Sequence, residues 1–203
     1  MTFRILLAAF AATFATPALA QPAAQAPAPA GAEDMVKVRL DTDLGAIVIA
    51  LDRGHAPLTV ANFLAYVDSG AFQGESFYRA MPYGAGGLVQ GGITSDARKL
   101  RPPVAFESTA RTGLSNTAGT IAMAATAPGK AQSDFFIMTT DITAFDGDNG
   151  FAAFGRVVEG MDVVKNILAA PVSPTEGLGA MKGQMLAPRV KIVKAARVDP
   201  PQQ

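Results

Sequence analysis

The stretch that decides the fold is residues 76–92, SFYRAMPYGAGGLVQGG. It begins with aromatic and aliphatic residues around a single arginine, Arg79, a composition typical of a strand. Pro82 and the glycines after it interrupt the strand and predict a turn. An apolar strand follows and ends at Gln90. One guanidinium and one amide thus stand among apolar side chains, which is typical of a shallow site that binds an uncharged backbone through hydrogen bonds.

The residues around Arg79 allow two interpretations. Strict alternation would place Arg79 on the face of Phe77 and Met81, although a bend at Pro82 could change this. Arg79 could also be an ordinary strand residue paired with an acid, with Gln90 satisfying the backbone at a bulge. The stretch alone does not decide between a functional pair and a structural one.

The composition excludes several kinds of site. The 203 residues contain 17 basic and 17 acidic side chains, whereas a nucleic-acid-binding protein needs a basic face. There is no cysteine, so disulfides, thiol catalysis and zinc–thiolate sites are excluded. The one histidine, His55, stands just before Pro57, a position typical of a turn or helix cap. We therefore expect neither a histidine-based triad nor a histidine metal site.

Two further motifs are incomplete. Asp146, Asp148 and Asn149 resemble part of a calcium-binding loop, but Phe151 and Val157 replace the required glycine and glutamate. The glycines of residues 84–87 lack the helix that follows in a dinucleotide-binding site. We expect no metal and no cofactor.

The composition divides the chain into four parts. Residues 1–20 combine a positive charge, a short apolar run and an A-x-A sequence, and predict a signal peptide. Residues 21–34 are rich in alanine and proline and predict a disordered linker. Residues 35–199 form the predicted folded domain, and residues 200–203 a tail. We expect an exported monomer, periplasmic in a Gram-negative cell, that does not remain inserted in the membrane after cleavage.

The folded part reads as a mainly β protein. Strands are predicted at 36–40, 45–51, 77–81, 88–90, 104–107, 119–125, 135–139, 151–158 and 189–198, and helices at 57–67 and 161–168, with an irregular segment at 171–188. About eight short antiparallel strands favour closure, because a barrel removes the exposed edges. We predict a closed eight-stranded antiparallel β-barrel capped by two α-helices.

Four motifs, in this order, resemble the cyclophilin family of peptidyl-prolyl cis-trans isomerases, especially its exported bacterial branch. They are APLTVANF at 56–63, FYR followed by VQGG at 77–92, GTIAMA with SDFFI at 119–137, and FDG with FGRVVEGMDVV at 145–164. The resemblance covers about residues 36–198. It implies the same barrel, proline-containing polypeptides as partners, and rotation about Xaa-Pro bonds during protein folding without a cofactor.

The resemblance also implies roles for residues. Arg79 would donate a hydrogen bond to the prolyl nitrogen as the amide twists, and Gln90 would hold the neighbouring carbonyl or position Arg79. The substrate-binding residues would be Phe136, Met123 and Leu88 around the proline ring, Phe145 as a wall, Ala124 against the residue before proline, and Asp134 and Phe151 at adjoining positions.

The chain departs from the family pattern at several positions. A few extra residues lie within 82–87, and Gly87 stands where the family has an aromatic residue, which Tyr83 could replace. Four further positions carry a different residue from the family: Asp134 stands for a glutamine, Ala125 for an asparagine, Ala144 for the tryptophan of eukaryotic members, and Phe151 for a polar ring residue. Loss of that tryptophan predicts weak cyclosporin binding.

These departures leave alternatives open. The same barrel could be catalytically weak and act as a module that binds proline-containing segments, or it could carry a small ligand. A carboxylate at Asp134 predicts a charge-assisted pair with Arg79, which would either orient the arginine or compete with the substrate for it.

Overall fold

A computed structural model describes residues 34–198, so the predicted signal peptide, the linker up to residue 33 and the C-terminal tail lie outside the described residues. The strands are β1 (Met35–Thr42), β2 (Gly45–Asp52), β3 (Ser76–Tyr83), β4 (Gly86–Gly92), β5 (Thr120–Met123), β6 (Phe135–Met138), β7 (Ala153–Glu159), β8 (Val172–Ser173) and β9 (Met185–Arg197). The helices are α1 (Pro57–Asp68), α2 (Thr109–Thr112) and α3 (Met161–Leu168).

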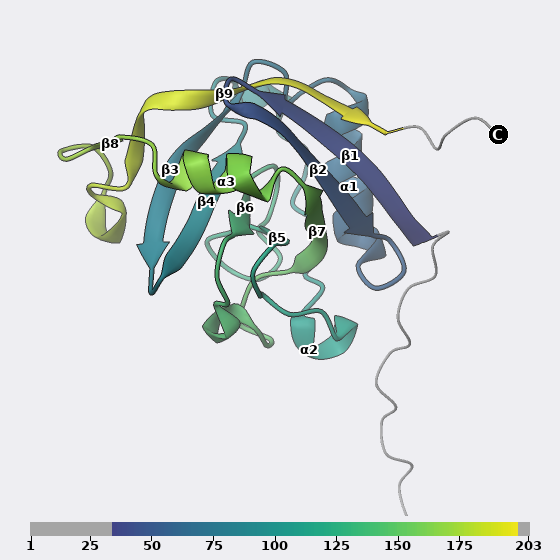
Figure 1. Cartoon of the computed structure of the whole chain (residues 1–203). Helices are drawn as coiled ribbons and strands as arrows, with labels where there is room; N and C mark the ends of the chain where they lie inside the picture. Colours follow the sequence, from purple (N-terminus) through teal and green to yellow (C-terminus); the bar gives the residue numbers. More distant parts are fainter. Residues whose placement is uncertain (1–33, 199–203) are drawn as a thin grey trace, which may run out of the picture.

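The strands close into the predicted barrel. They follow the order β1-β2-β7-β5-β6-β4-β3-β9, and β9 pairs again with β1, so eight strands form a ring (Figure 1). All these pairings are antiparallel, and β8 extends the sheet beyond β9. The prediction of a closed eight-stranded antiparallel barrel is confirmed.

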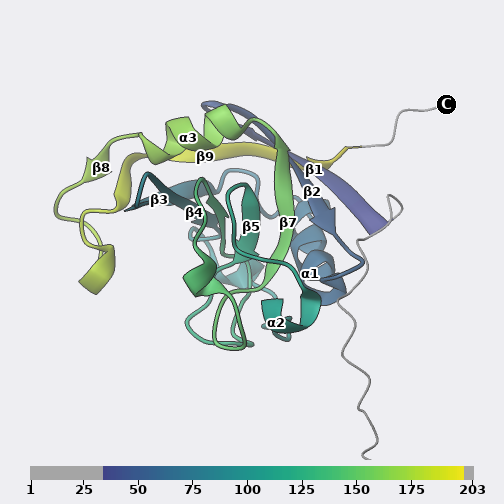
Figure 2. The same cartoon turned by 60° about the horizontal axis from the view of Figure 1, so that its bottom comes forward.

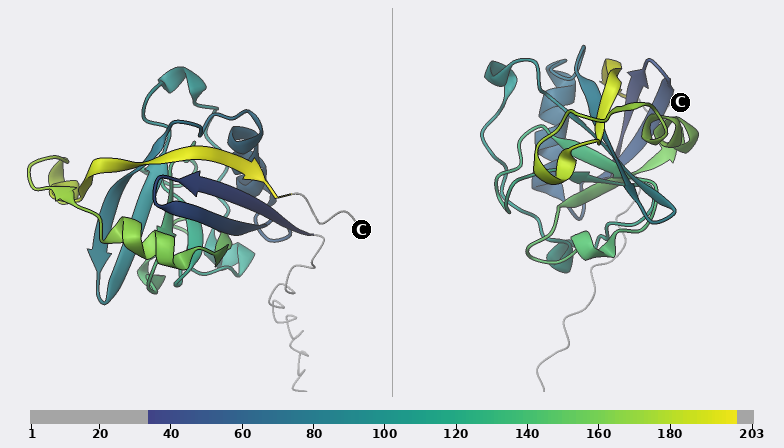
Figure 3. Two further views of the ribbon diagram at one scale, coloured as in Figure 1. Left: turned by 45° about the horizontal axis from the view of Figure 1, so that its top comes forward. Right: turned by 90° about the vertical axis from the view of Figure 1, so that its left-hand side faces the viewer.

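Helices α1 and α3 lie on opposite sides of the barrel (Figures 1 and 3). Pro57 begins α1, as its lack of a backbone N–H allows. The preceding Ala56 has no side chain that can cap, and the Glu107 carboxylate accepts hydrogen bonds from the backbone N–H groups of Leu58 and Thr59 instead. A loop 48 or more residues away thus fixes the start of the helix.

Two details of the predicted element list are wrong. Residues 104–107 form no strand, because Val104 makes one backbone bond, to Ala131, while the Glu107 side chain serves α1. The segment 171–188, predicted as irregular, contains β8 and the beginning of β9. The single turn α2 was also not expected. None of the helices in the described residues is long and apolar enough to cross a membrane.

The barrel interior is an aromatic core. Five phenylalanines from α1, the following loop and three strands are completely buried and contact one another with ring centroids 5.1–5.7 Å apart: Phe63, Phe72, Phe77, Phe135 and Phe154. Val164 and Ile167 of α3 are also fully buried. Because the interior is filled with side chains, a ligand must bind to the outside of the barrel.

Candidate active site

A bulge in β3 places the arginine outside the core. Phe77 pairs with Gly91 and Arg79 pairs with Gln90, so Tyr78 is an extra residue in the strand. Phe77 is fully buried in the barrel interior, whereas Tyr78 and Arg79 line a cavity outside it. Strict alternation would have placed Arg79 on the face of Phe77, and the bulge instead keeps Arg79 on the outer side together with Tyr78.

This cavity has a volume of about 650 Å³ and crosses five neighbouring strands. In sheet order, Ala124 follows β5, Phe136 lies on β6, Gln90 on β4, Arg79 on β3 and Met185 on β9. We call it the Arg79 cavity. Figure 2 shows β3 and β4, which pair with each other, beneath α3, and β5 follows farther along the sheet, beyond β6. A peptide lying in the cavity would therefore run across the strands.

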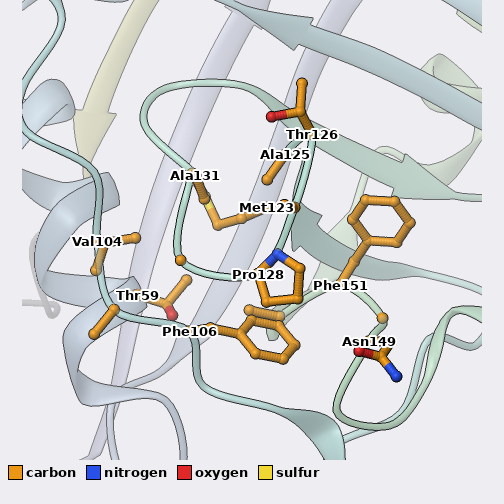
Figure 4. A pocket seen from close by; sticks show the side chains of 15 residues that line it. Thr59, Val104, Phe106, Met123, Ala125, Thr126, Pro128, Ala131, Asn149 and Phe151 are labelled. Carbon is orange, nitrogen blue, oxygen red and sulfur yellow. The ribbon is translucent and has the colours of Figure 1, made fainter.

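The structure brings together eight of the nine predicted site residues: Arg79, Gln90, Phe136, Leu88, Ala124, Phe145, Asp134 and Phe151. Met123 is the exception. On β5, Ala122 belongs to a second apolar cluster on the outside of the sheet, whereas Met123 belongs to the barrel core. The other members of this outer apolar cluster are Leu88, Phe136, Met138 and Ile142. Met123 also lines a smaller neighbouring cavity of about 200 Å³, which Phe151 borders as well (Figure 4). The structure therefore does not bring Met123 into the Arg79 cavity, where its predicted role would place it.

Uncharged groups hold the Arg79 guanidinium. Its Nε donates to Gln184 Oε1 at 2.8 Å, its Nη1 to Gln90 Oε1 at 2.9 Å, and its Nη2 contacts Met81 Sδ at 3.2 Å. Among the ion pairs formed within residues 34–198, none includes Arg79. Burial lowers the pKa of Arg79, but a guanidinium remains protonated in proteins. The site therefore holds a positive charge that no carboxylate neutralises.

Asp134 pairs with a tyrosine instead of the arginine. The Tyr78 hydroxyl donates to Asp134 Oδ2 at 3.0 Å and accepts from Gln90 Nε2 at 2.6 Å. The predicted Asp134–Arg79 pair is thus wrong, because the bulged Tyr78 and Gln90 stand between the two charges. The chain of contacts orients the Gln90 amide, with its oxygen toward Arg79 and its nitrogen toward Tyr78.

Burial controls the protonation of the acid and the phenol. It raises the pKa of Asp134, although hydrogen bonds from Tyr78 and Ser133 act in the opposite direction. Burial also raises the pKa of Tyr78, and the neighbouring Asp134 charge adds to this effect. Tyr78 therefore stays a neutral hydrogen-bond donor at physiological pH.

Three phenylalanine rings form the apolar wall. Phe136, Phe145 and Phe151 contact one another edge to face, with centroids 4.8–5.8 Å apart. The buried Asn116 holds the loop that carries two of them, because its Nδ2 donates to the backbone oxygens of Phe145 and Phe151 and to Asp146 Oδ1. Such a pocket suits a compact apolar ring.

The groups considered for other chemistry have structural roles. His55 Nδ1 lies 2.9 Å from Asp52 Oδ2, and its backbone N–H donates to the same carboxylate, which closes the turn before α1. The Asp146 carboxylate accepts from Ser115 and Asn116. Across residues 34–198, no three histidine or acidic side chains are close enough to share a metal ion.

Several site residues escaped sequence reasoning. Gln184, Leu178 and Met181 all lie in the segment predicted as irregular, yet they reach the Arg79 cavity. The sequence shows Met181 as an apolar residue within a polar segment, but its sequence neighbours do not indicate where its side chain packs. Tyr83 does not replace the missing aromatic, since it is 47% exposed and does not line the cavity. A side chain at Gly87 would collide with the Met81 carbonyl oxygen, 2.1 Å from the position of its Cβ.

A closed antiparallel barrel with an arginine and an aromatic wall in a groove on its outside defines the cyclophilin class. The model of the family described as cyclophilin type peptidyl-prolyl cis-trans isomerase/CLD matches residues 36–196, and the chain belongs to this family. The predicted family and isomerase activity are confirmed.

The relatives agree with this assignment. A peptidyl-prolyl cis-trans isomerase of Acinetobacter baylyi is 38% identical over 141 residues, which cover 67% of this chain and 73% of that protein. Peptidyl-prolyl cis-trans isomerase A of Dickeya dadantii is 44% identical over 137 residues, covering 64% and 70%. The crystal structure of a cyclophilin type isomerase of Cryptosporidium parvum has the same fold, with a TM-score of 0.68 at 20% identity over 82% of this chain and 99% of that one.

Proposed function

We propose that Arg79 is the catalytic residue, that Gln90 positions it, and that the protein accelerates rotation about Xaa-Pro bonds in folding polypeptides. One observation carries the proposal: the guanidinium lies in an apolar cavity with three uncharged partners. These contacts use three of its five N–H donors, so two remain for a substrate.

The chemistry needs a donor and no nucleophile. Rotation about the peptide bond crosses a barrier of about 18–20 kcal/mol because the amide loses its conjugation. In the twisted state the prolyl nitrogen regains its lone pair and becomes a hydrogen-bond acceptor. A donor fixed beside that nitrogen binds the twisted amide better than either planar isomer, which lowers the barrier. Arg79 supplies this donor, and the Gln90–Tyr78 contact keeps it in place.

The other predicted site residues bind the substrate. Phe136, Leu88 and Phe145 provide an apolar surface for the proline ring. Ala124, at the β5 end of the cavity, contacts the residue before proline. Met123 is left out of this set, since its side chain belongs to the barrel core.

Exchange spectroscopy by NMR on an Ala-Pro peptide tests the proposal. We expect the wild-type protein to accelerate cis-trans exchange and Arg79→Ala to reduce kcat/KM by about a hundredfold, the usual cost of removing a fixed donor. Arg156→Ala, which removes an exposed arginine outside the Arg79 cavity, is the matched control and should keep full activity. Peptide binding without acceleration by the wild-type protein would instead favour the binding-module alternative.

We also propose that the protein is exported as a monomer. The composition of residues 1–20 supports export, and a cavity built from one copy of the chain needs no second subunit. N-terminal sequencing of the protein from the periplasm of a Gram-negative host should give a chain beginning at Gln21. Sedimentation should give the mass of one chain. An uncleaved N-terminus or a larger mass would overturn the corresponding part.

A further inference from the structure

The segment between β8 and β9 forms an additional wall of the Arg79 cavity. We call residues 174–184 the arm; it includes the 3-10 helix at Gly179–Met181 and lies beside β3 at the left of the molecule in Figure 1. Leu178 and Met181 line the cavity although they are 84% and 41% exposed. Leu178 is thus a large apolar side chain that the fold itself does not bury.

Hydrogen bonds fix the arm at its base. The Gln184 side chain accepts from Arg79 Nε and donates to the Ala180 carbonyl oxygen, both at 2.8 Å. The Gln184 backbone oxygen accepts from the Ala80 N–H at 2.9 Å, and the Gly183 N–H donates to the Glu176 oxygen at 2.9 Å. One side chain therefore joins the arm to the arginine, so the arm holds a set place relative to Arg79.

The order of the strands decides which part of a substrate meets the arm. Ala124 follows β5 and Phe136 lies on β6, whereas the arm leads into β9, three strands beyond β6. At about 4.8 Å per strand this distance is about 14 Å, which about four extended residues span. A peptide with its proline on Phe136 and its preceding residue on Ala124 therefore sends its following residues toward the arm.

We propose that the arm is a specificity element that binds a large apolar side chain within the four residues after the proline. Leu178, Met181 and Met185 supply the contact surface, and methionine adapts to side chains of different shape. The preferred substrates are then proline segments followed by a large apolar residue such as phenylalanine or leucine. This role presupposes the isomerase site proposed above and names the class of substrate that the site prefers.

A positional scan of peptides tests the proposal. The peptides are Ala-Pro-Gly-Gly-Gly-Gly and four versions with phenylalanine at the first, second, third or fourth position after the proline. We expect kcat/KM of the wild-type protein to be about fivefold higher for at least one phenylalanine peptide than for the all-glycine peptide, as partial burial of one apolar side chain allows. In the double variant Leu178→Ser/Met181→Ser this ratio should fall to about one.

Val193→Ser is the matched control, because Val193 is 51% exposed on β9 and does not line the Arg79 cavity. It should keep the wild-type ratio. A ratio that survives in the double variant, or that falls equally in the control, would overturn the role of the arm. Failure of the proposed isomerase site would give a different result, because the protein would then accelerate cis-trans exchange in none of the peptides. A binding measurement by NMR adds a second readout: the Leu178 methyl signals should shift with the preferred phenylalanine peptide and not with the all-glycine one.

Discussion

Phe135 and Phe136 are adjacent in the chain, yet they belong to two different parts of the molecule. Phe135 points into the barrel, where it contacts the rings of Phe63, Phe72 and Phe77. Phe136 points outward and forms the wall of the Arg79 cavity. The difference teaches that one strand divides its side chains between stability and substrate binding, since successive residues of a strand face opposite sides.

Strand β3 also divides its residues between the core and the cavity, and its bulge adds one extra residue to the cavity side. Phe77 is in the core, and both Tyr78 and Arg79 are outside it. The inner face is closed and apolar, whereas the outer face combines apolar rings with a charge. Substitutions on the inner face should therefore change stability and largely spare activity, and substitutions on the outer face should do the reverse.

Phe135→Ala gives the largest expected effect and tests the inner face. We expect the free energy of unfolding to fall by about 3–5 kcal/mol, because a fully buried ring leaves a void among packed aromatic side chains. Urea denaturation measures the loss. Activity per folded molecule should remain near the wild-type value. A cost below about 1 kcal/mol would show that the core collapses into the void and that the inner face is not rigid.

Phe136→Ala tests the outer face. We expect kcat/KM on an Ala-Pro peptide to fall about tenfold or more, because the proline ring loses its main apolar contact. The free energy of unfolding should fall by less than for Phe135→Ala, because Phe136 packs in the smaller apolar cluster and borders an open cavity, whereas Phe135 is enclosed on all sides by the core. Exchange NMR and urea denaturation give the two values. Equal stability costs for Phe135→Ala and Phe136→Ala would contradict the division between faces.

Asp134→Asn is expected to change the free energy of unfolding least, and the size of this change should depend on pH. Burial raises the pKa of Asp134 above its ordinary value of 3.8, so the folded state favours the protonated acid. Its stabilising contribution is therefore complete below pH 3.8 and is lost as the pH rises through the higher pKa of the folded state. Asparagine keeps an oxygen that can accept the Tyr78 hydroxyl and has no charge to bury. The variant should thus be more stable than the wild type at neutral pH.

Urea denaturation between pH 3.5 and pH 7 measures this difference, which should disappear toward the acidic end. Asp148→Asn, in an exposed position of the 146–150 loop, serves as the control and should show no such trend. A variant that is less stable than the wild type at neutral pH would mean that the Asp134 charge stabilises the fold.

Much of the fold follows from local patterns. Pro57 at the start of a helical repeat predicted α1, and the alternation of apolar residues predicted the strands that close the barrel. The pairing of Arg79 with Gln90 was also accessible, because their two strands are joined by a short turn. Features set by neighbours in the sequence were therefore predictable.

The remaining features depend on contacts between distant residues. Tyr78 and Asp134 are 56 positions apart, and Arg79 and Gln184 are 105 apart. The bulge shifts the pairing of β3 by one residue, which a period of two cannot reveal. These three facts explain why the predicted partner of Asp134 was wrong, and why the sequence left open both the face of Arg79 and the position of the arm.

The pairing of β1 with β9 has a practical consequence. Val38 lies opposite Arg197, and the Val198 N–H donates to the Lys37 oxygen at 2.9 Å, so both ends of the described domain leave from the same place. Met185, at the cavity, stands at the other end of the 13-residue strand β9, up to about 40 Å away at about 3.3 Å per residue. The domain could therefore be fused or immobilised through either end without obstructing the Arg79 cavity, and joining the two ends by a short linker offers a route to circular permutation.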